Sequence, residues 1–265
     1  VKAGYFDETD EVVGIAHVLE HMYFKGTAQY GVGEIAKATK AAGGYLNAHT
    51  IYDHTSYYAV LPASGFDEGL AVQADAYANS AIEGDALAKE LEVIIQEAMR
   101  KEDNAGAVTT ETLYALLHDR HRIRRWRIGR PDALRGFTRD DVTRFYRNFY
   151  TPSNTVLAIA GDVDPAETLE RVKALYGALP AGEPLRSPGP AEPEHSGFRY
   201  QELSGDVEQT HVEIGWRTVP NEHPDVAALD VAAAVLGSGR ASRLYRAVRD
   251  RKLAGSVGAY NYSPA

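Results

Sequence analysis

The order of apolar and polar residues along positions 1–180 predicts a mixed α/β domain. Residues 44–48 and 55–61 are predicted to form a pair of strands, since the second segment is rich in β-branched and tyrosine side chains. Residues 155–160 form a short apolar run that predicts a further strand. Helical patterns cover 13–24, a segment after Gly33, 66–82, 86–103, 109–118, 140–150 and 165–176.

A proline-rich segment then interrupts the pattern, which restarts after it. Residues 181–197 are rich in Pro, Gly, Glu and Ser and nearly lack apolar side chains, so they are predicted to be an extended linker between domains 1–180 and 198–265. In the second domain we expect strands near 198–203 and 211–216, helices over 224–236 and 241–249, and a strand from Ser256. This domain stops while still adding elements, so we expect it to be incomplete.

Composition narrows the function classes only in part. The 265 residues are 44% hydrophobic, which is enough for a sizeable core, and the net charge of -9 argues against nucleic acid or an anionic membrane surface as the partner. No window approaches the apolar length that spans a bilayer. The sequence begins at Val1 without Met or a signal peptide, so we expect a processed or trimmed piece. The compartment is not readable, although the composition favours the bacterial periplasm or cytoplasm over the mitochondrial matrix.

The segment His17-Val18-Leu19-Glu20-His21 carries the clearest chemistry. On a helix, His17 and His21 lie one turn apart on the same face and can bind one metal ion. Glu20 lies close enough to accept a proton from a water at the metal, and the order of residues is that of the inverted zincin motif. Because the chain has no cysteine, any zinc must be coordinated by histidine and carboxylate side chains.

A catalytic zinc usually takes a third protein ligand, and the predicted helix 86–103 offers several. Glu90 and Glu97 are seven residues apart, so they project from one face about 10 Å apart along the helix axis. One could bind zinc while the other supports the site from outside. Spacing alone does not choose between them, and Glu92 or Glu102 are possible too.

Several segments, taken together, resemble a known family. They are Gly14–Thr27 (GIAHVLEHMYFKGT), Gly43–Tyr58 (GGYLNAHTIYDHTSYY), Glu90–Asp103, Tyr150-Thr151-Pro152, Ala160-Gly161-Asp162, and Ser242-Arg243-Leu244 with Arg249. In these positions the chain resembles the pitrilysin and mitochondrial processing peptidase family of zinc metallopeptidases. The resemblance implies an α/β fold of two homologous domains, the second incomplete here, each with a mixed, largely antiparallel sheet and helices packed on one face.

The resemblance also implies a role for individual residues. It makes His17, His21 and Glu97 the ligands of one Zn²⁺ ion per chain, Glu20 the general base, and Glu90 the acidic residue of the active site one heptad before Glu97. The strand with Asn47 and Ala48 is expected to bind a peptide substrate as an added strand, and Phe24 to line the pocket beside the scissile bond.

One departure from the family pattern bears on partners. In active assemblies of this family a second-domain helix ends in Arg, followed seven residues later by Tyr, and both hold the substrate carbonyl. Arg249 fits, but Gly255 or Ser256 stands where Tyr is expected, and Tyr260 and Tyr262 are out of register. We therefore expect a homologous subunit, or a missing C-terminal half, to supply the Arg-Tyr pair.

These observations predict a zinc-dependent endopeptidase that hydrolyses peptides or unfolded protein segments. The competing interpretation is a non-catalytic structural or docking subunit of the same fold. Such subunits commonly lose a ligand or the base, whereas all four key positions are intact here, which favours the enzyme.

Overall fold

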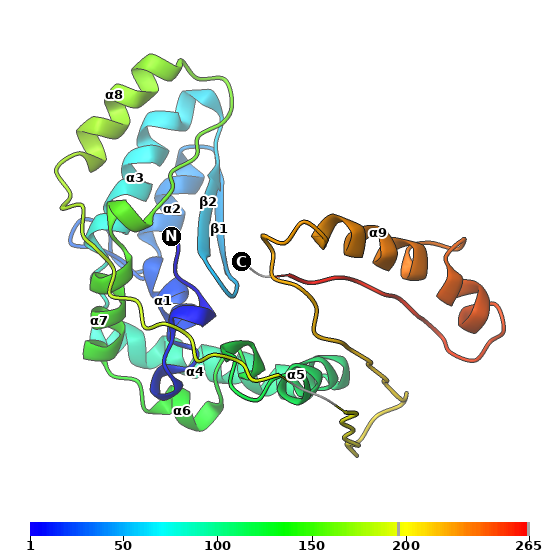
Figure 1. The fold of residues 1–265 in the computed structure, drawn as a ribbon. Helices are drawn as coiled ribbons and strands as arrows, with labels where there is room; N and C mark the ends of the chain where they lie inside the picture. The colour runs from blue at the N-terminus through cyan, green and yellow to red at the C-terminus, as the bar shows by residue number, and fades with distance from the viewer. Residues whose placement is uncertain (195–196, 264–265) are drawn as a thin grey trace. The chain divides into compact units, whose positions relative to one another are not determined.

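The structure is a computed structural model that describes residues 1–194 and 197–263. It divides into two compact units, Val1–Gly215 and Trp216–Ala265 (Figure 1). Residues 195 and 196 of the predicted linker, and the last two residues of the predicted second domain, lie outside the described ranges.

The first unit is rich in helices and the second is built around one. In the first unit the helices are α1 (Ile15–Tyr23), α2 (Glu34–Ala41), α3 (Phe66–Asn79), α4 (Gly84–Glu102), α5 (Ala105–Leu117), α6 (Pro131–Arg135), α7 (Arg139–Phe149) and α8 (Pro165–Tyr176). The second unit contains α9 (Val226–Gly237) and a π-helical turn over Tyr245–Arg249, within the segment 241–249 that was predicted to be a helix. The helical patterns in the sequence therefore located these elements to within a few residues, except for the short helix α6, which no pattern predicted.

The predicted strand pair forms an antiparallel hairpin, β1 (Tyr45–Thr50) and β2 (Thr55–Val60). Its register pairs Tyr45 with Val60 and Thr50 with Thr55. Along β1, half-buried residues alternate with exposed ones, so Thr50 lies on the half-buried face. Helices with a small antiparallel sheet confirm the predicted α/β class.

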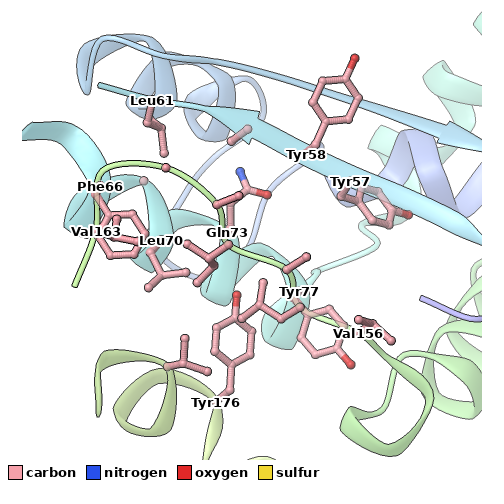
Figure 2. Close-up of a pocket in the computed structure, with 18 of the residues that line it drawn as sticks. Tyr57, Tyr58, Leu61, Phe66, Leu70, Gln73, Tyr77, Val156, Val163 and Tyr176 are labelled. Atoms are coloured by element: carbon pink, nitrogen blue, oxygen red, sulfur yellow. The ribbon is translucent and has the colours of Figure 1, made fainter. Parts of the chain in front are cut away.

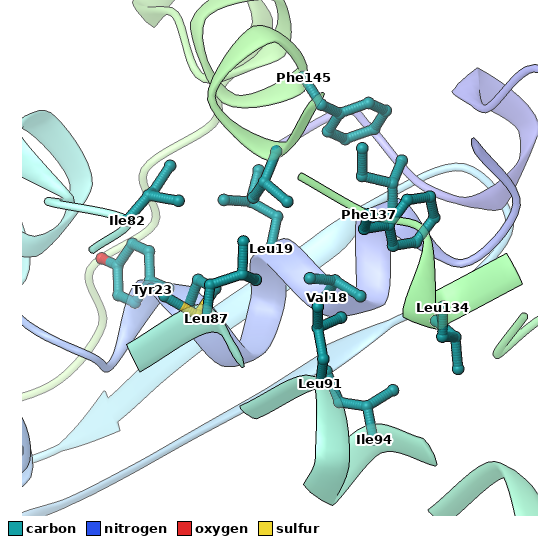
Figure 3. Close-up of a cluster of buried hydrophobic side chains, with 14 of the residues drawn as sticks. Val18, Leu19, Tyr23, Ile82, Leu87, Leu91, Ile94, Leu134, Phe137 and Phe145 are labelled. Carbon is teal, nitrogen blue, oxygen red and sulfur yellow. The ribbon is translucent and has the colours of Figure 1, made fainter. Parts of the chain in front are cut away.

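Helix α1 lies at the centre of the hydrophobic core of the first unit. It packs against α4, α7 and β1, and all of its residues except His21 are buried. Figure 3 shows Val18 and Leu19 of α1 among side chains from α4 and from the segment that contains α6 and α7. Burial of this whole helix fixes where its polar residues can point, because α1 cannot rotate without exposing apolar surface to water.

A buried carboxylate anchors the start of α1. Glu8 accepts hydrogen bonds from the amides of Gly14 and Ala16, both at 3.0 Å. Burial raises the pKa of Glu8 to about 8, against the opposing effect of these two donors. Gly14 has φ of +99°, and a Cβ there would lie 2.7 Å from the carbonyl oxygen of Ile128, so the turn into α1 requires glycine.

The strand predicted over 155–160 is not part of a ladder, and this prediction was wrong. The segment is extended, but a cavity of about 530 Å³ separates it from β2. Residues of β2, Tyr57 among them, line one side of this cavity, and Val156 of the extended segment lines another (Figure 2). Without backbone pairing, an apolar run does not become a strand.

The strands predicted near 198–203, 211–216 and from Ser256 are also absent from the described ranges, where β1 and β2 are the strands present. The segment before Gly215 contacts a helix instead of a strand. Thr110 of α5 donates a hydrogen bond to Glu213 at 2.6 Å, and Gly215 lies against Leu113 and Leu117. Side-chain contacts with α5 thus replace the expected strand pairing.

The described part of the predicted linker is extended and held to the first unit by specific contacts. The carboxylate of Glu192 accepts hydrogen bonds from the amides of Asp119, Arg120 and His121 at 2.6–2.8 Å. Burial would raise the pKa of Glu192, but these three donors outweigh it and lower that pKa to about 2. The domain boundaries drawn from the sequence stay a prediction. In the described part of the chain, no helix has the length and apolar character needed to cross a membrane.

Candidate metal centre

Helices α1 and α4 bring three potential metal ligands together. His17 and His21 come from α1 and Glu97 from α4, and one ligand atom of each lies within 4.8 Å of the other two. The Oε2 atom of Glu97 is 3.9 Å from Nε2 of His17 and 3.8 Å from Nε2 of His21. The two imidazole rings face each other edge-on, with centroids 4.7 Å apart.

His21 is contacted by α4 at both ring nitrogens. Its Nδ1 atom is hydrogen-bonded to Oε1 of Glu90 at 2.8 Å, while its Nε2 atom faces Glu97. An ionised carboxylate can only accept, so the neutral imidazole carries its proton on Nδ1 and its lone pair on Nε2 when it makes this hydrogen bond. Burial would raise the pKa of Glu90, but hydrogen bonds from Lys25 and His21 outweigh it and hold that pKa below its usual value.

His17 is held in the neutral state that metal binding requires. Burial, together with the charges of His21 and Lys101, lowers the pKa of His17 to about 3. Its Nδ1 atom is buried and has no hydrogen-bond partner among the described residues. A neutral imidazole offers a lone pair to a metal without first losing a proton.

These three side chains fit a zinc ion. Zinc bonds of about 2.1 Å in a tetrahedron place ligand atoms about 3.4 Å apart. The Glu97 oxygen therefore has to approach each imidazole nitrogen by about half an ångström, and ligand atoms up to 4.8 Å apart have to close by more. Two imidazoles and a carboxylate are a ligand set that catalytic zinc sites use. The other candidates on α4 lie elsewhere, since Glu92 is exposed and Glu102 pairs with Arg130 at 2.7 Å.

Glu20 lies beside this cluster and is hydrogen-bonded to β1. Thr50 donates its hydroxyl to Oε2 of Glu20 at 2.5 Å. Burial raises the pKa of Glu20, and the hydrogen bond from Thr50 opposes this rise. A carboxyl group whose pKa lies above its usual value is better suited to accept and return a proton near neutral pH.

The three residues predicted to contact substrate lie in different surroundings. Ala48 shares the half-buried face of β1 with Thr50, whereas Asn47 points to the exposed face and accepts a hydrogen bond from the amide of Ala48 at 2.9 Å. Phe24 ends α1, where its ring packs edge-on against Tyr23 and Tyr57. The structure therefore brings Ala48 toward the side of Glu20, while Asn47 lies on the opposite face of β1 and Phe24 follows the end of α1.

Sequence reasoning missed two residues of the site, Lys25 and Thr50. Lys25 pairs with Glu90 at 2.5 Å, and Thr50 contacts Glu20. The period of two along the strand could have found Thr50, because it follows Ala48 on the same face. No comparable signal exists for Lys25, whose contact depends on how α1 and α4 pack.

An inverted His-x-x-Glu-His helix packed against a glutamate-bearing helix, next to an antiparallel hairpin, defines the class of inverted-motif zinc peptidases. Residues 1–126 match the family model described as Insulinase (Peptidase family M16), and residues 136–265 match the one described as Peptidase M16 inactive domain. The chain belongs to peptidase family M16.

Similar proteins agree with this assignment. An uncharacterized zinc protease of Mycobacterium leprae is 36% identical over 261 residues, covering 97% of this chain and 58% of that protein. The uncharacterized zinc protease YmxG of Bacillus subtilis is 30% identical over 266 residues, covering 99% of this chain and 64% of that protein. The chain thus spans about three fifths of the length of these relatives.

Solved structures give the same result. A protease from Helicobacter pylori superposes with a TM-score of 0.87 at 26% identity, covering 99% of this chain and 65% of that one. The periplasmic protease PqqL from Escherichia coli gives a TM-score of 0.65 at 26% identity over 72% of this chain and 22% of that one. The names of these relatives, zinc proteases, associate the family with zinc and with a peptidase role.

Proposed function

We propose that the chain is the zinc-bearing half of a metalloendopeptidase that hydrolyses peptides or unfolded protein segments. The observation that carries the proposal is the cluster of His17, His21 and Glu97, with Glu20 beside it. These three residues would hold one Zn²⁺ ion per chain. Zinc bound there would polarise a peptide carbonyl and lower the pKa of a water molecule toward 7.

Three further residues, Glu20, Thr50 and Glu90, are assigned separate roles in the reaction. Glu20 accepts a proton from the attacking water as the new carbon–oxygen bond forms, and delivers a proton to the amine nitrogen as the carbon–nitrogen bond breaks. Thr50 holds the Glu20 carboxylate in place with its hydroxyl. Glu90 orients His21 through Nδ1, so we assign it a positioning role within the active site.

The substrate is proposed to lie along β1. This strand pairs with β2 on one side, and no other strand in the described ranges pairs with it. An extended peptide could add there through main-chain hydrogen bonds, which give affinity without demanding a sequence. Asn47 and Ala48 would border that peptide, and Phe24 would contribute to the wall beside the scissile bond.

A partner is part of the proposal. Residues 136–265 match a family model described as inactive, and the Arg-Tyr pair of active assemblies is incomplete after Arg249. We propose that a homologous half of the assembly supplies that pair. The same inactive-domain match supports the alternative of a non-catalytic structural or docking subunit.

Hydrolysis of a quenched, unstructured peptide tests the proposal. The chain is assayed with zinc, alone and with a homologous inactive-domain protein, and Glu20→Gln is the matched blank because it retains the shape of the side chain. We expect bound zinc in both proteins and turnover only in the wild type, increased by the partner. Zinc binding with no turnover under either condition would favour the structural subunit. Equal turnover by Glu20→Gln would refute the role of Glu20.

A further inference from the structure

One lysine contacts the outer side of the candidate metal centre. Lys25 Nζ pairs with Oε2 of Glu90 at 2.5 Å, and Oε1 of the same carboxylate is hydrogen-bonded to Nδ1 of His21 at 2.8 Å. We propose that Lys25 is a positioning residue, which holds Glu90 against His21 and so fixes the direction in which His21 presents Nε2. This inference rests on the proposed function, because it assigns His21 to a metal.

The backbone places Lys25 for this contact. Helix α1 ends at Tyr23, and the amide of Lys25 donates to the carbonyl of Met22 at 3.0 Å, which keeps Lys25 in a tight turn after the helix. His21 therefore lies in the last turn of α1, and Lys25 lies in the turn that follows the helix. Both side chains contact the carboxylate of Glu90 on α4.

The contact is well enough buried to restrain the carboxylate. The side chain of Glu90 is 10% exposed and that of Lys25 is 29% exposed. In the described part of the chain, no side chain other than Lys25 and His21 pairs with Glu90. Each oxygen of Glu90 thus has its own partner, and rotation of the carboxylate would break both contacts.

Loss of Lys25 would leave Oε2 of Glu90 buried without a partner, which costs free energy. The carboxylate would then turn toward solvent, and the bond to Nδ1 of His21 would weaken. Residues that orient metal ligands in this way commonly change metal affinity by about 10- to 100-fold when they are lost. Lys25 is thereby linked to zinc affinity although it lies outside the ligand cluster.

The experiment compares Lys25→Met with Lys25→Arg and with Lys89→Met. Lys89 is the matched control, because it precedes Glu90 on α4 and its side chain is exposed. Zinc affinity is measured by competition with a chelator, and the visible spectrum of the Co²⁺-loaded protein reports ligand geometry. Thermal unfolding of the zinc-free proteins shows whether each variant folds.

We expect Lys25→Met to bind zinc at least about 10-fold more weakly and to alter the Co²⁺ spectrum. Lys25→Arg, which keeps a charged donor, should restore most of the affinity, and Lys89→Met should match the wild type. In the peptide assay with saturating zinc, kcat should fall in Lys25→Met while KM stays constant.

Wild-type zinc affinity and an unchanged Co²⁺ spectrum in a folded Lys25→Met protein would overturn the role of Lys25. So would equal losses in Lys25→Met and Lys25→Arg. A wild-type chain that binds no zinc would overturn the proposed function as well. If the chain binds zinc but does not cleave peptide, the zinc affinities and Co²⁺ spectra of the variants still test the role of Lys25.

Discussion

Replacement of Glu111 by Gln should destabilise the first unit. The Glu111 side chain on α5 is 3% exposed, and its Oε1 atom accepts hydrogen bonds from Nζ of Lys101 at 2.6 Å and from Nε of Arg127 at 2.8 Å. Lys101 lies one turn beyond Glu97 on α4, so this ion cluster supports the helix that carries the third candidate ligand. In the variant, a neutral amide would face two cations.

The magnitude follows from the burial of the three partners. Removing one member of a buried ion pair costs about 3–5 kcal/mol when the remaining charge has no other partner. Lys101 is 20% and Arg127 33% exposed, so water and the amide oxygen of Gln offset part of this cost. We expect a loss of about 2–3 kcal/mol in the free energy of unfolding, or about 4–12 °C in Tm for a unit of this size.

Thermal and urea denaturation of the full chain, followed by circular dichroism, measure this loss. Glu102→Gln is the matched control, because Glu102 is a glutamate that pairs with one cation, Arg130, at 2.7 Å, but with side chains that are 36% and 58% exposed. That variant should change stability by less than about 1 kcal/mol. Equal effects of the two substitutions, or a loss below about 1 kcal/mol for Glu111→Gln, would refute the reasoning.

Three further predictions concern the site itself. Gly14→Ala should cost about 1–3 kcal/mol, seen as a lower urea midpoint, because φ is +99° and the new Cβ meets Ile128; an unchanged midpoint would contradict this. In the zinc-free chain, the folded-state pKa of His17 lies at about 3, below its unfolded value of about 6.5, so stability should fall as pH drops from 6.5 toward 3, by at most about 1.4 kcal/mol per pH unit. His17→Gln should flatten that slope, and an unchanged slope would exclude His17 as its source. Thr50→Val should raise the pKa of Glu20, because the charged carboxylate loses a hydrogen-bond donor, and should therefore shift the acidic limb of the pH profile of kcat/KM to higher pH. Thr50→Ser keeps the donor and should leave the limb in place; identical profiles in both variants would argue against the contact.

The helices other than the five-residue α6 were predictable from the sequence because their patterns are local. The strand pair over 44–48 and 55–61 was predictable for the same reason, since the two segments are close in the chain. The run 155–160 shows the limit: its composition suits a strand, but pairing depends on what lies beside it, and there the neighbour is a cavity. Strand formation is a property of two segments, and a single run does not reveal its partner.

The candidate site divides in the same way. The spacing of His17, Glu20 and His21 was sufficient to place them on one helix, and the heptad placed Glu90 and Glu97 on one face of another. Which glutamate faces both histidines depends on where α1 crosses α4. The spacing of residues along the sequence does not reveal the position of that crossing. The contact between Lys25 and Glu90 depends on that crossing too.

Two glutamates of α4 face the two ring nitrogens of His21, Glu90 at Nδ1 and Glu97 at Nε2, and this arrangement constrains the number of residues between them. One inserted or deleted residue in this stretch would turn Glu97 by about 100° around the helix and shift it by about 1.5 Å, while Glu90 stayed on Nδ1. The imidazole would remain oriented, but the carboxylate that faces Nε2 would point away. Insertions and deletions should therefore be excluded from the seven-residue span that joins the two glutamates, even though its exposed residues, such as Val93 and Gln96, could be exchanged freely.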